Sequence, residues 1–163
     1  MKKIIRKVKF KKVESFVYNN EAANSVTPNN LKYTLTIFNE SEKTNIPQID
    51  RQSYFKAYAV FDENKLAHVS FVFKNNLLAK QLGFKQALTI GECVTNANYR
   101  GQGIYPTILQ QIRSDLSHNI LIVFVHPSNL SSIKGIEKAG FKRLYQFIMY
   151  RFLGINLYTR KIN

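Results

Sequence analysis

The chain has 163 residues, the size of one ordinary globular domain. Apolar residues make up 45% of it and charged residues 21%, and no apolar run approaches the roughly 18 residues that a membrane-spanning helix needs. This composition excludes a helical membrane protein, a collagen-like chain and a wholly disordered one, and it supplies enough apolar side chains for a layered core.

The formal net charge of +14 is concentrated at the two ends of the chain. Residues 1–12 contain seven Lys or Arg and no acidic residue, and residues 138–163 contain six more, again without an acid. Such a charge attracts nucleic acid, an anionic membrane surface or a phosphorylated ligand, although a solvated basic surface without a partner explains it equally well. Charge alone therefore does not choose the partner.

Cysteine usage and the start of the chain predict a cytoplasmic protein. The single cysteine, Cys93, cannot form an internal disulfide, and no Cys/His cluster has the spacing of zinc ligands, so no metal site is expected. The basic first residues are not followed by the apolar segment of a signal peptide.

The first 50 residues predict a β-rich N-terminal extension. Residues 8–17 alternate apolar and polar side chains and predict one bent strand, and residues 31–38 alternate more cleanly and predict a second. Residues 19–30 and 40–52 are polar and predict loops too short to separate two domains. We therefore expect a single domain spanning residues 1–163.

The remaining residues predict strands interrupted by two helices. The expected strands are 54–61 and 66–73 around a four-residue hairpin loop, then 87–95, 120–125, 144–152 and 155–162. Residues 105–116 carry apolar side chains at helical spacing, and residues 129–139 fit a short helix with Asn129 as N-cap and Gly140 at its end. The pattern predicts an α/β domain with a crossover in its second half.

A glycine-containing loop lies between the strand at 87–95 and the first helix. Its residues Arg100, Gly101, Gln102 and Gly103 let the backbone approach a ligand, and the free N–H groups of the helix's first turn favour an anion. No P-loop sequence occurs, and the dinucleotide fingerprint fails because Pro106 stands where its third glycine belongs. This loop predicts a phosphate or pyrophosphate site, or simply a tight turn.

Two motifs in order resemble those of the GCN5-related N-acetyltransferase (GNAT) superfamily. The first is the Asn-Tyr-Arg-Gly-Gln-Gly-Ile run of residues 98–104 at a strand-to-helix junction, which departs from the family pattern at Tyr105, where Gly or Ala is usual. The second follows a buried strand, and its matching residues are Asn129, Ser132, Ile133, Glu137, Lys138, Gly140 and Phe141. The resemblance covers residues 54–162 and implies a mixed, mostly antiparallel sheet flanked by helices.

The resemblance implies acetyl-CoA as co-substrate and assigns residues to it. The pyrophosphate would lie on the backbone of Gly101, Gln102, Gly103, Ile104 and Tyr105, with Arg100 adding positive potential. The pantetheine arm would run between the strands ending near Thr95 and Val125, which splay apart in this family. The backbone N–H of Val94 or Thr95 would hold the thioester carbonyl, and Asn129 and Ser132 would border the arm.

The resemblance also implies a catalytic base and a catalytic acid. Glu92 lies on the strand where many members of the family carry a glutamate, and it is the candidate base. The family's usual acid is a tyrosine at the position that Ile136 occupies here, so Tyr145 and Tyr105 are both candidates to replace it, and Tyr145 is taken as the catalytic residue. Packing alone explains either tyrosine, and an ion pair explains Glu92.

Three functions follow as hypotheses. The first is an N-acetyltransferase that moves acetyl from acetyl-CoA to a primary amine of a small anionic acceptor, such as a nucleotide-linked amino sugar or a polysaccharide precursor. The second is a peptide or protein N-acetyltransferase. The third is a binding module that has lost catalysis, which Tyr105 and Ile136 motivate. No motif favours nucleic acid, and a homodimer is possible on this reading.

Overall fold

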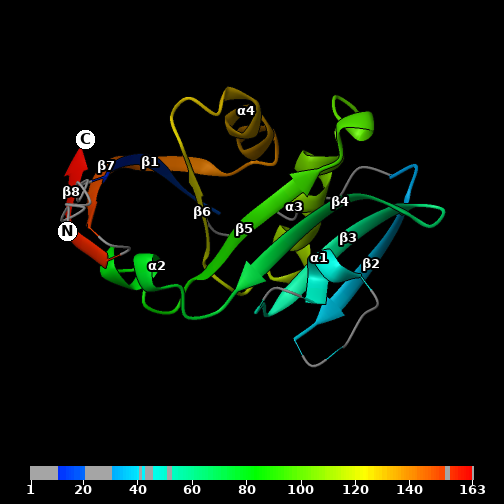
Figure 1. The fold of residues 1–163 in the computed structure, drawn as a ribbon, viewed down its shortest axis with the longest axis horizontal. Helices are drawn as coiled ribbons and strands as arrows, with labels where there is room; N and C mark the ends of the chain where they lie inside the picture. Colours follow the sequence, from blue (N-terminus) through cyan, green and yellow to red (C-terminus); the bar gives the residue numbers. More distant parts are fainter. Residues whose placement is uncertain are drawn as a thin grey trace, which may run out of the picture.

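The structure, a computed structural model, describes residues 11–20, 31–40, 42, 46–50, 53–152 and 155–162. The described strands form one eight-stranded sheet in the order β2-β3-β4-β5-β6-β1-β7-β8 (Figure 1). Their bounds are β1 Lys11–Asn19, β2 Thr34–Asn39, β3 Lys56–Asp62, β4 Lys65–Phe73, β5 Leu88–Thr95, β6 Leu121–Val125, β7 Lys142–Phe152 and β8 Ile155–Ile162.

The sheet is mixed and mostly antiparallel, as the sequence predicts. Among the described ladders only β5 and β6 run parallel. Parallel neighbours need a crossover connection, and the helix α3 (Ile104–Asp115) supplies it. Strand β1 lies inside the sheet, between β6 and β7, so the N-terminal part of the chain contributes an interior strand. The predicted strand residues before Lys11 lie outside the described residues.

The two predicted helices are confirmed, together with their end signals. Helix α4 (Leu130–Lys138) begins after Asn129, whose Oδ1 accepts a hydrogen bond from the Ser132 backbone N–H at 3.2 Å. It ends at Gly140, whose φ of 82° lies in the left-handed region that glycine tolerates best. The short helices α1 (Pro47–Asp50) and α2 (Leu77–Gln81) and the 3₁₀ turn Ala97–Tyr99 are too short to give a periodic signal and were not predicted.

One prediction of loop length is wrong. The sequence predicts a four-residue loop at 62–65, but Asp62 pairs with Lys65, so that β3 and β4 join through the two residues Glu63 and Asn64. Glu63 has a φ of 53°, which is the positive value that tight hairpin turns require.

The main core lies between the sheet and helices α3 and α4. The side chains of Ile108, Leu109 and Ile112 on α3 and Ile136 on α4 are fully buried in it. Each buried aliphatic side chain of this kind contributes about 1.5–3 kcal/mol. Figure 1 shows both helices on one side of the strands. They fix the ends of β5 and β6, between which the candidate site lies.

Strands β5 and β6 separate after a short stretch of pairing. Their parallel register runs from Leu88 opposite Leu121 to Ile90 opposite Val123. Beyond that point the two strands diverge, as Figure 1 shows. The β5 backbone groups that face β6 beyond Ile90 therefore border an opening instead of a neighbouring strand in the described structure.

Candidate active site

A cleft of about 320 Å³ occupies the opening between β5 and β6. Helices α3 and α4 close it on one side, so that four elements contribute to its walls. The residues that line it are Ile90, Gly91, Glu92, Cys93, Val94, Tyr105, Val123, Phe124, Val125, His126, Asn129, Ser132 and Ile136. Apolar side chains and polar groups both line it, a mixture that suits a small molecule with polar and apolar parts.

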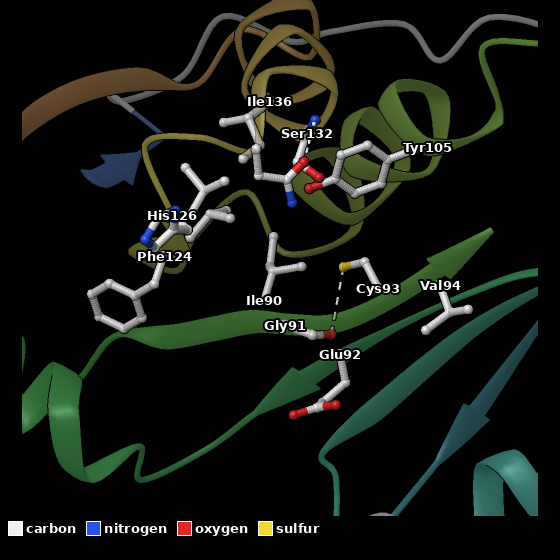
Figure 2. Close-up of a pocket in the computed structure, with 13 residues that line it drawn as sticks. Ile90, Gly91, Glu92, Cys93, Val94, Tyr105, Phe124, His126, Ser132 and Ile136 are labelled. Atoms are coloured by element: carbon white, nitrogen blue, oxygen red, sulfur yellow. Dashed lines mark hydrogen bonds between the residues drawn. The ribbon is translucent and has the colours of Figure 1, made fainter. Parts of the chain in front are cut away.

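A β-bulge in β5 decides which side chains enter the cleft. The register with β4 shifts between the pairs Val69–Val94 and Phe71–Gly91, so that two β5 residues oppose Ser70 alone. At the first of these, Glu92, the backbone φ is 50°. Figure 2 shows the result: the Cys93 thiol lies on the cleft side of β5, and the Glu92 carboxylate lies on the opposite side of the strand.

Tyr105 reaches into the cleft from the first turn of α3 (Figure 2). Its ring fills a notch above Gly135 on α4, where an added Cβ would lie 2.6 Å from the Tyr105 Cδ1 atom. Burial and the neighbouring Cys93 thiol raise the pKa of the Tyr105 hydroxyl above its usual range. The hydroxyl is therefore protonated at neutral pH and can donate a hydrogen bond to a group in the cleft.

The loop before α3 has the geometry of an anion site. Gly101 and Gly103 have φ values of 75° and 74°, and an added Cβ at either would meet no atom within 4 Å. Gly103 is the N-cap and has no side chain to satisfy the first amides of the helix. Arg100 is exposed beside them, and its Nε donates to the Thr95 carbonyl at 3.3 Å. Amides, helix dipole and a cation thus coincide at this end of α3.

The opposite wall of the cleft is formed by β6 and α4. Ile136, at the position of the family's usual tyrosine, is fully buried and apolar. Asn129 and Ser132 line the cleft at the first turn of α4. The exposed His126 closes the end of β6, and its Nδ1 accepts a hydrogen bond from the Ser128 backbone N–H at 3.2 Å. Because a backbone N–H can only donate, Nδ1 must accept, so a neutral His126 ring carries its proton on Nε2.

The structure brings together many of the predicted site residues and separates others. Glu92, Val94, Tyr105, Asn129 and Ser132 line the cleft. Thr95 and the loop residues Arg100, Gly101, Gln102, Gly103 and Ile104 are not among the lining residues and lie between the end of β5 and the first turn of α3.

Tyr145 occupies a different part of the molecule. It lies on β7, where its ring stacks on Phe84 with centroids 6.4 Å apart, and the Lys161 ammonium lies 4.3 Å from its ring centroid. It is not among the residues that line the cleft. Burial raises the pKa of its hydroxyl. Tyr145 lies away from the cleft because β1 separates β7 from β6 in the sheet. Tyr145 pairs with Val17, which is a residue of β1.

The sequence analysis missed a row of polar groups beneath Tyr105. His68 and Ser70 on β4 are 1% and 0% exposed, and the His68 ring centroid lies 5.9 Å from that of Tyr105. The His68 Nδ1 lies 2.7 Å from the Thr95 Oγ1, and its Nε2 lies 2.8 Å from the Ser70 Oγ. Thr95, His68 and Ser70 thus form a row of hydrogen-bonded side chains. In the sequence, the alternate positions of His68 and Ser70 indicate that both face the same side of a strand. They do not indicate which residues of the neighbouring strand these side chains contact.

Nowhere in the described residues do three or more His, Cys, Asp or Glu side chains gather closely enough to hold a metal ion. Within the same residues, each helix is too short or too polar to cross a bilayer.

Comparison with known proteins gives the fold. No family model and no curated protein matches this sequence. Among solved structures, an acetyltransferase of the GNAT family from Novosphingobium aromaticivorans superposes with a TM-score of 0.64 at 13% identity, over 85% of this chain and 63% of its own. A GNAT-family acetyltransferase from Colwellia psychrerythraea gives 0.58 at 16%, over 88% and 57%. A GCN5-related N-acetyltransferase-like protein from Streptococcus suis gives 0.57 at 11%, over 88% and 62%.

These likenesses establish that the chain has the GNAT fold. At 10–16% identity they show the fold alone, because one fold carries many functions. The chain also spans less than two thirds of the length of each of these solved structures.

Proposed function

We propose that the protein is an acetyl-CoA-dependent N-acetyltransferase that transfers acetyl to a primary amine by direct attack. The observation that carries the proposal is the conjunction of two features on a GNAT fold: the open cleft between β5 and β6, and the glycine loop at the N-terminus of α3 beside it. Either feature alone is common. Together they fit a long ligand with a pyrophosphate at one end and an acyl group at the other.

The loop 101–105 suits the pyrophosphate of acetyl-CoA. Its two glycines hold positive φ values that keep side chains away from the helix N-terminus, and the first amides of α3 have no side-chain cap. The exposed Arg100 adds a full positive charge next to the partial charge of the helix. Asn129 and Ser132 on the far wall would border the pantetheine arm.

The bulged end of β5 supplies donors for the thioester carbonyl. Backbone N–H groups that are not used by a neighbouring strand stabilise an oxyanion without any reorganisation. The N–H of Val94 or Thr95, past the point where β5 leaves β6, would fill this role. A water-poor cleft wall, here the buried Ile136 side chain, strengthens such a contact.

We assign the general acid to Tyr105 instead of Tyr145. Tyr105 lines the cleft, and its hydroxyl is protonated at neutral pH, so it can donate a hydrogen bond to the leaving thiolate. In this chain the aromatic residue stands on α3, and Ile136 stands where the family places its tyrosine on α4. Tyr105 on α3 would thus supply the hydroxyl that the family pattern places on α4, at the position of Ile136.

Glu92 remains the proposed base. Its carboxylate lies across β5 from the Cys93 thiol (Figure 2), and we propose that the acceptor approaches from that side. An attacking amine and a leaving thiolate need proton transfer at different points around the carbonyl carbon. A base on one side of β5 and an acid on the other meet that requirement, with a water molecule between Glu92 and the amine.

The acceptor is proposed to be a small anionic amine. The net charge of +14 supports this choice, since a positive field raises the local concentration of anionic substrates. A peptide amine is the alternative, and both can be assayed side by side. An amino-sugar phosphate and a lysine-containing peptide are suitable probes, compared by kcat/KM with thiol release from acetyl-CoA.

Isothermal titration with acetyl-CoA tests the cofactor site. We expect micromolar binding by the wild type and a loss of at least about 100-fold in Gly103→Val, because a side chain would block the helix amides. Gly83→Val is the matched control, since Gly83 also has a positive φ of 94° with open space around it and follows α2. Both variants carry similar backbone strain, so equal losses of affinity, or no wild-type binding at millimolar ligand, would contradict the proposal.

A further inference from the structure

Two tyrosines lie beside the glycine loop of residues 100–103. Tyr33 immediately precedes β2, and Tyr99 ends the 3₁₀ turn that leads into the loop. Their rings meet edge to face with centroids 5.6 Å apart, and both rings pack, half-buried, against the main core. This packing fixes where the two hydroxyl groups lie.

Each hydroxyl donates a hydrogen bond to a different part of the chain. The Tyr33 hydroxyl donates to Oε1 of Gln102 at 2.5 Å, and Nε2 of the same Gln102 side chain donates to the Asn98 carbonyl at 3.3 Å. The Tyr99 hydroxyl donates to Oδ2 of Asp62, the last residue of β3, at 2.9 Å. The loop is therefore tied to the start of β2 through Gln102 and to the end of β3 through Tyr99.

We propose that Tyr33, Gln102, Tyr99 and Asp62 are positioning residues that hold the glycine loop in the conformation that binds the pyrophosphate of acetyl-CoA. We call these four side chains the loop brace. This inference rests on the proposed function, because it needs the pyrophosphate to bind at residues 101–105. The side chains of the brace act on the ligand only through the backbone of the loop.

The loop needs such a brace because packing does not hold its glycines. Gly101 and Gly103 have positive φ values, and an added Cβ at either would meet no atom within 4 Å. Glycine loses more conformational freedom than any other residue when it is ordered, and a loop that is ordered only by its ligand weakens binding by that cost. Gln102 carries the one side chain between the two glycines, so its bond to Tyr33 restricts this segment before the ligand arrives.

A purely structural role explains the rings of the two tyrosines but not their hydroxyl groups. Phenylalanine at either position would bury the same apolar surface against the core. The hydrogen bond between Tyr33 and Gln102 is exposed to solvent, so water competes for both groups and the bond adds little to the stability of the fold. Its effect falls on the loop that it holds.

The first test is a mutant cycle read as affinity for acetyl-CoA by isothermal titration. Tyr33→Phe and Tyr99→Phe each remove one hydroxyl and keep the ring. We expect binding to weaken about fivefold in Tyr33→Phe and about tenfold in Tyr99→Phe, because the Tyr99 hydroxyl donates to a charged group. Gln102→Met removes the acceptor of Tyr33, so adding Tyr33→Phe to it should weaken binding no further.

The second test compares two acetyl donors. S-acetylpantetheine carries the thioester and the pantetheine arm but lacks the pyrophosphate. With acetyl-CoA as donor, we expect both tyrosine variants to raise KM and to leave kcat unchanged, whereas with S-acetylpantetheine kcat/KM should equal that of the wild type. A tyrosine that only supports the fold would lower transfer from both donors alike. The amine is whichever of the two probes, the amino-sugar phosphate or the lysine peptide, turns over faster.

Tyr54→Phe is the matched control. Tyr54 is also half-buried, but it packs in a different apolar cluster, with its ring centroid 5.5 Å from that of Phe71, and its substitution should change neither affinity nor rate. The brace is wrong, while the acetyltransferase stands, if both tyrosine variants bind acetyl-CoA like the wild type, if the losses of Tyr33→Phe and Gln102→Met multiply, or if both donors are affected equally. If the wild type neither binds acetyl-CoA nor transfers acetyl to either probe, both proposals fail together.

Discussion

The two walls of the cleft differ in chemistry. The wall made by β5 and α3 presents the Cys93 thiol and the Tyr105 hydroxyl, with His68 and Ser70 behind them. The wall made by β6 and α4 has the apolar side chains of Val123 and the fully buried Ile136 where the strands separate, and its polar groups, Asn129 and Ser132, stand at the first turn of α4. The two walls therefore differ in where their polar groups lie.

This difference gives the two walls different roles in the proposed reaction. An apolar wall excludes water and strengthens every hydrogen bond formed opposite to it. A polar wall can supply and recover protons, provided that its groups satisfy one another when no ligand is present. We therefore expect changes on the β5–α3 wall to alter the chemical step, and the following predictions test that expectation in order of decreasing effect.

The largest expected effect is on stability at acid pH. The folded-state pKa of His68 is lowered to about 4 from an ordinary value of 6.5, so the unfolded chain binds a proton that the folded chain rejects. The resulting stabilisation is complete above pH 6.5 and is lost as the pH falls towards 4, a difference of about 3 kcal/mol. Urea unfolding at pH 7 and pH 4 should show that the free energy of unfolding falls by about 3 kcal/mol less in His68→Gln than in the wild type. An equal loss in both proteins would contradict a neutral, buried His68.

Removal of the acid should cost about 100-fold in the rate of acetyl transfer. Tyr105→Phe keeps the ring in its notch against Gly135 and removes only the hydroxyl, so acetyl-CoA affinity should be retained. Tyr145→Phe is the companion variant, because that ring lies on β7 against Phe84. A larger loss of rate in Tyr145→Phe than in Tyr105→Phe would return the acid to the position that the sequence analysis favoured.

Displacing the Tyr105 ring should have a smaller effect, about tenfold in rate. In Gly135→Ala the new methyl group would lie 2.6 Å from Cδ1 of Tyr105, so the ring must shift. Alanine is favoured over glycine within a helix by about 1 kcal/mol, so the folded state should not be weakened in proportion. A thermal melt beside the rate measurement separates the two effects. An unchanged rate would mean that the orientation of Tyr105 does not matter to transfer.

The effect of removing the base is similar at neutral pH and becomes the smallest at higher pH. Glu92→Gln removes a carboxylate that is exposed to solvent, where hydroxide can take over at higher pH. We expect about a tenfold loss of rate near neutral pH that shrinks as the pH rises. A loss that is independent of pH would indicate that Glu92 binds the acceptor instead of taking its proton.

The order of the elements and the glycine loop were predictable from local sequence. Apolar spacing indicates α3, and Asn129 and Gly140 mark the two ends of α4. Each of these signals lies within a few residues of the structure it specifies. The β-branched run at 120–125 likewise predicted a strand buried on both faces, and β6 lies between β5 and β1.

The position of β1 and the location of the acid were not predictable in the same way. Phe16 pairs with Val125, more than 100 residues away, and alternation along a strand does not say which strand it joins. Tyr145 lies away from the cleft for the same reason, because β1 stands between β6 and β7. The bulge at Glu92 and the contact of His68 with Thr95 also depend on the register of β4 against β5, which only the folded sheet defines.

The central claim is that acetyl-CoA occupies the cleft between β5 and β6, and the single cysteine of the chain allows a direct test. Cys93 lines that cleft, and burial raises the pKa of its thiol to about 11, so alkylation should be slow but measurable at mildly alkaline pH. The measurement is the rate of Cys93 modification by N-ethylmaleimide, followed by mass spectrometry, with and without saturating acetyl-CoA. We predict that acetyl-CoA slows the reaction of the folded protein strongly and has no effect on the protein unfolded in urea. An equal rate in the presence and absence of a bound ligand would place acetyl-CoA elsewhere and contradict the account.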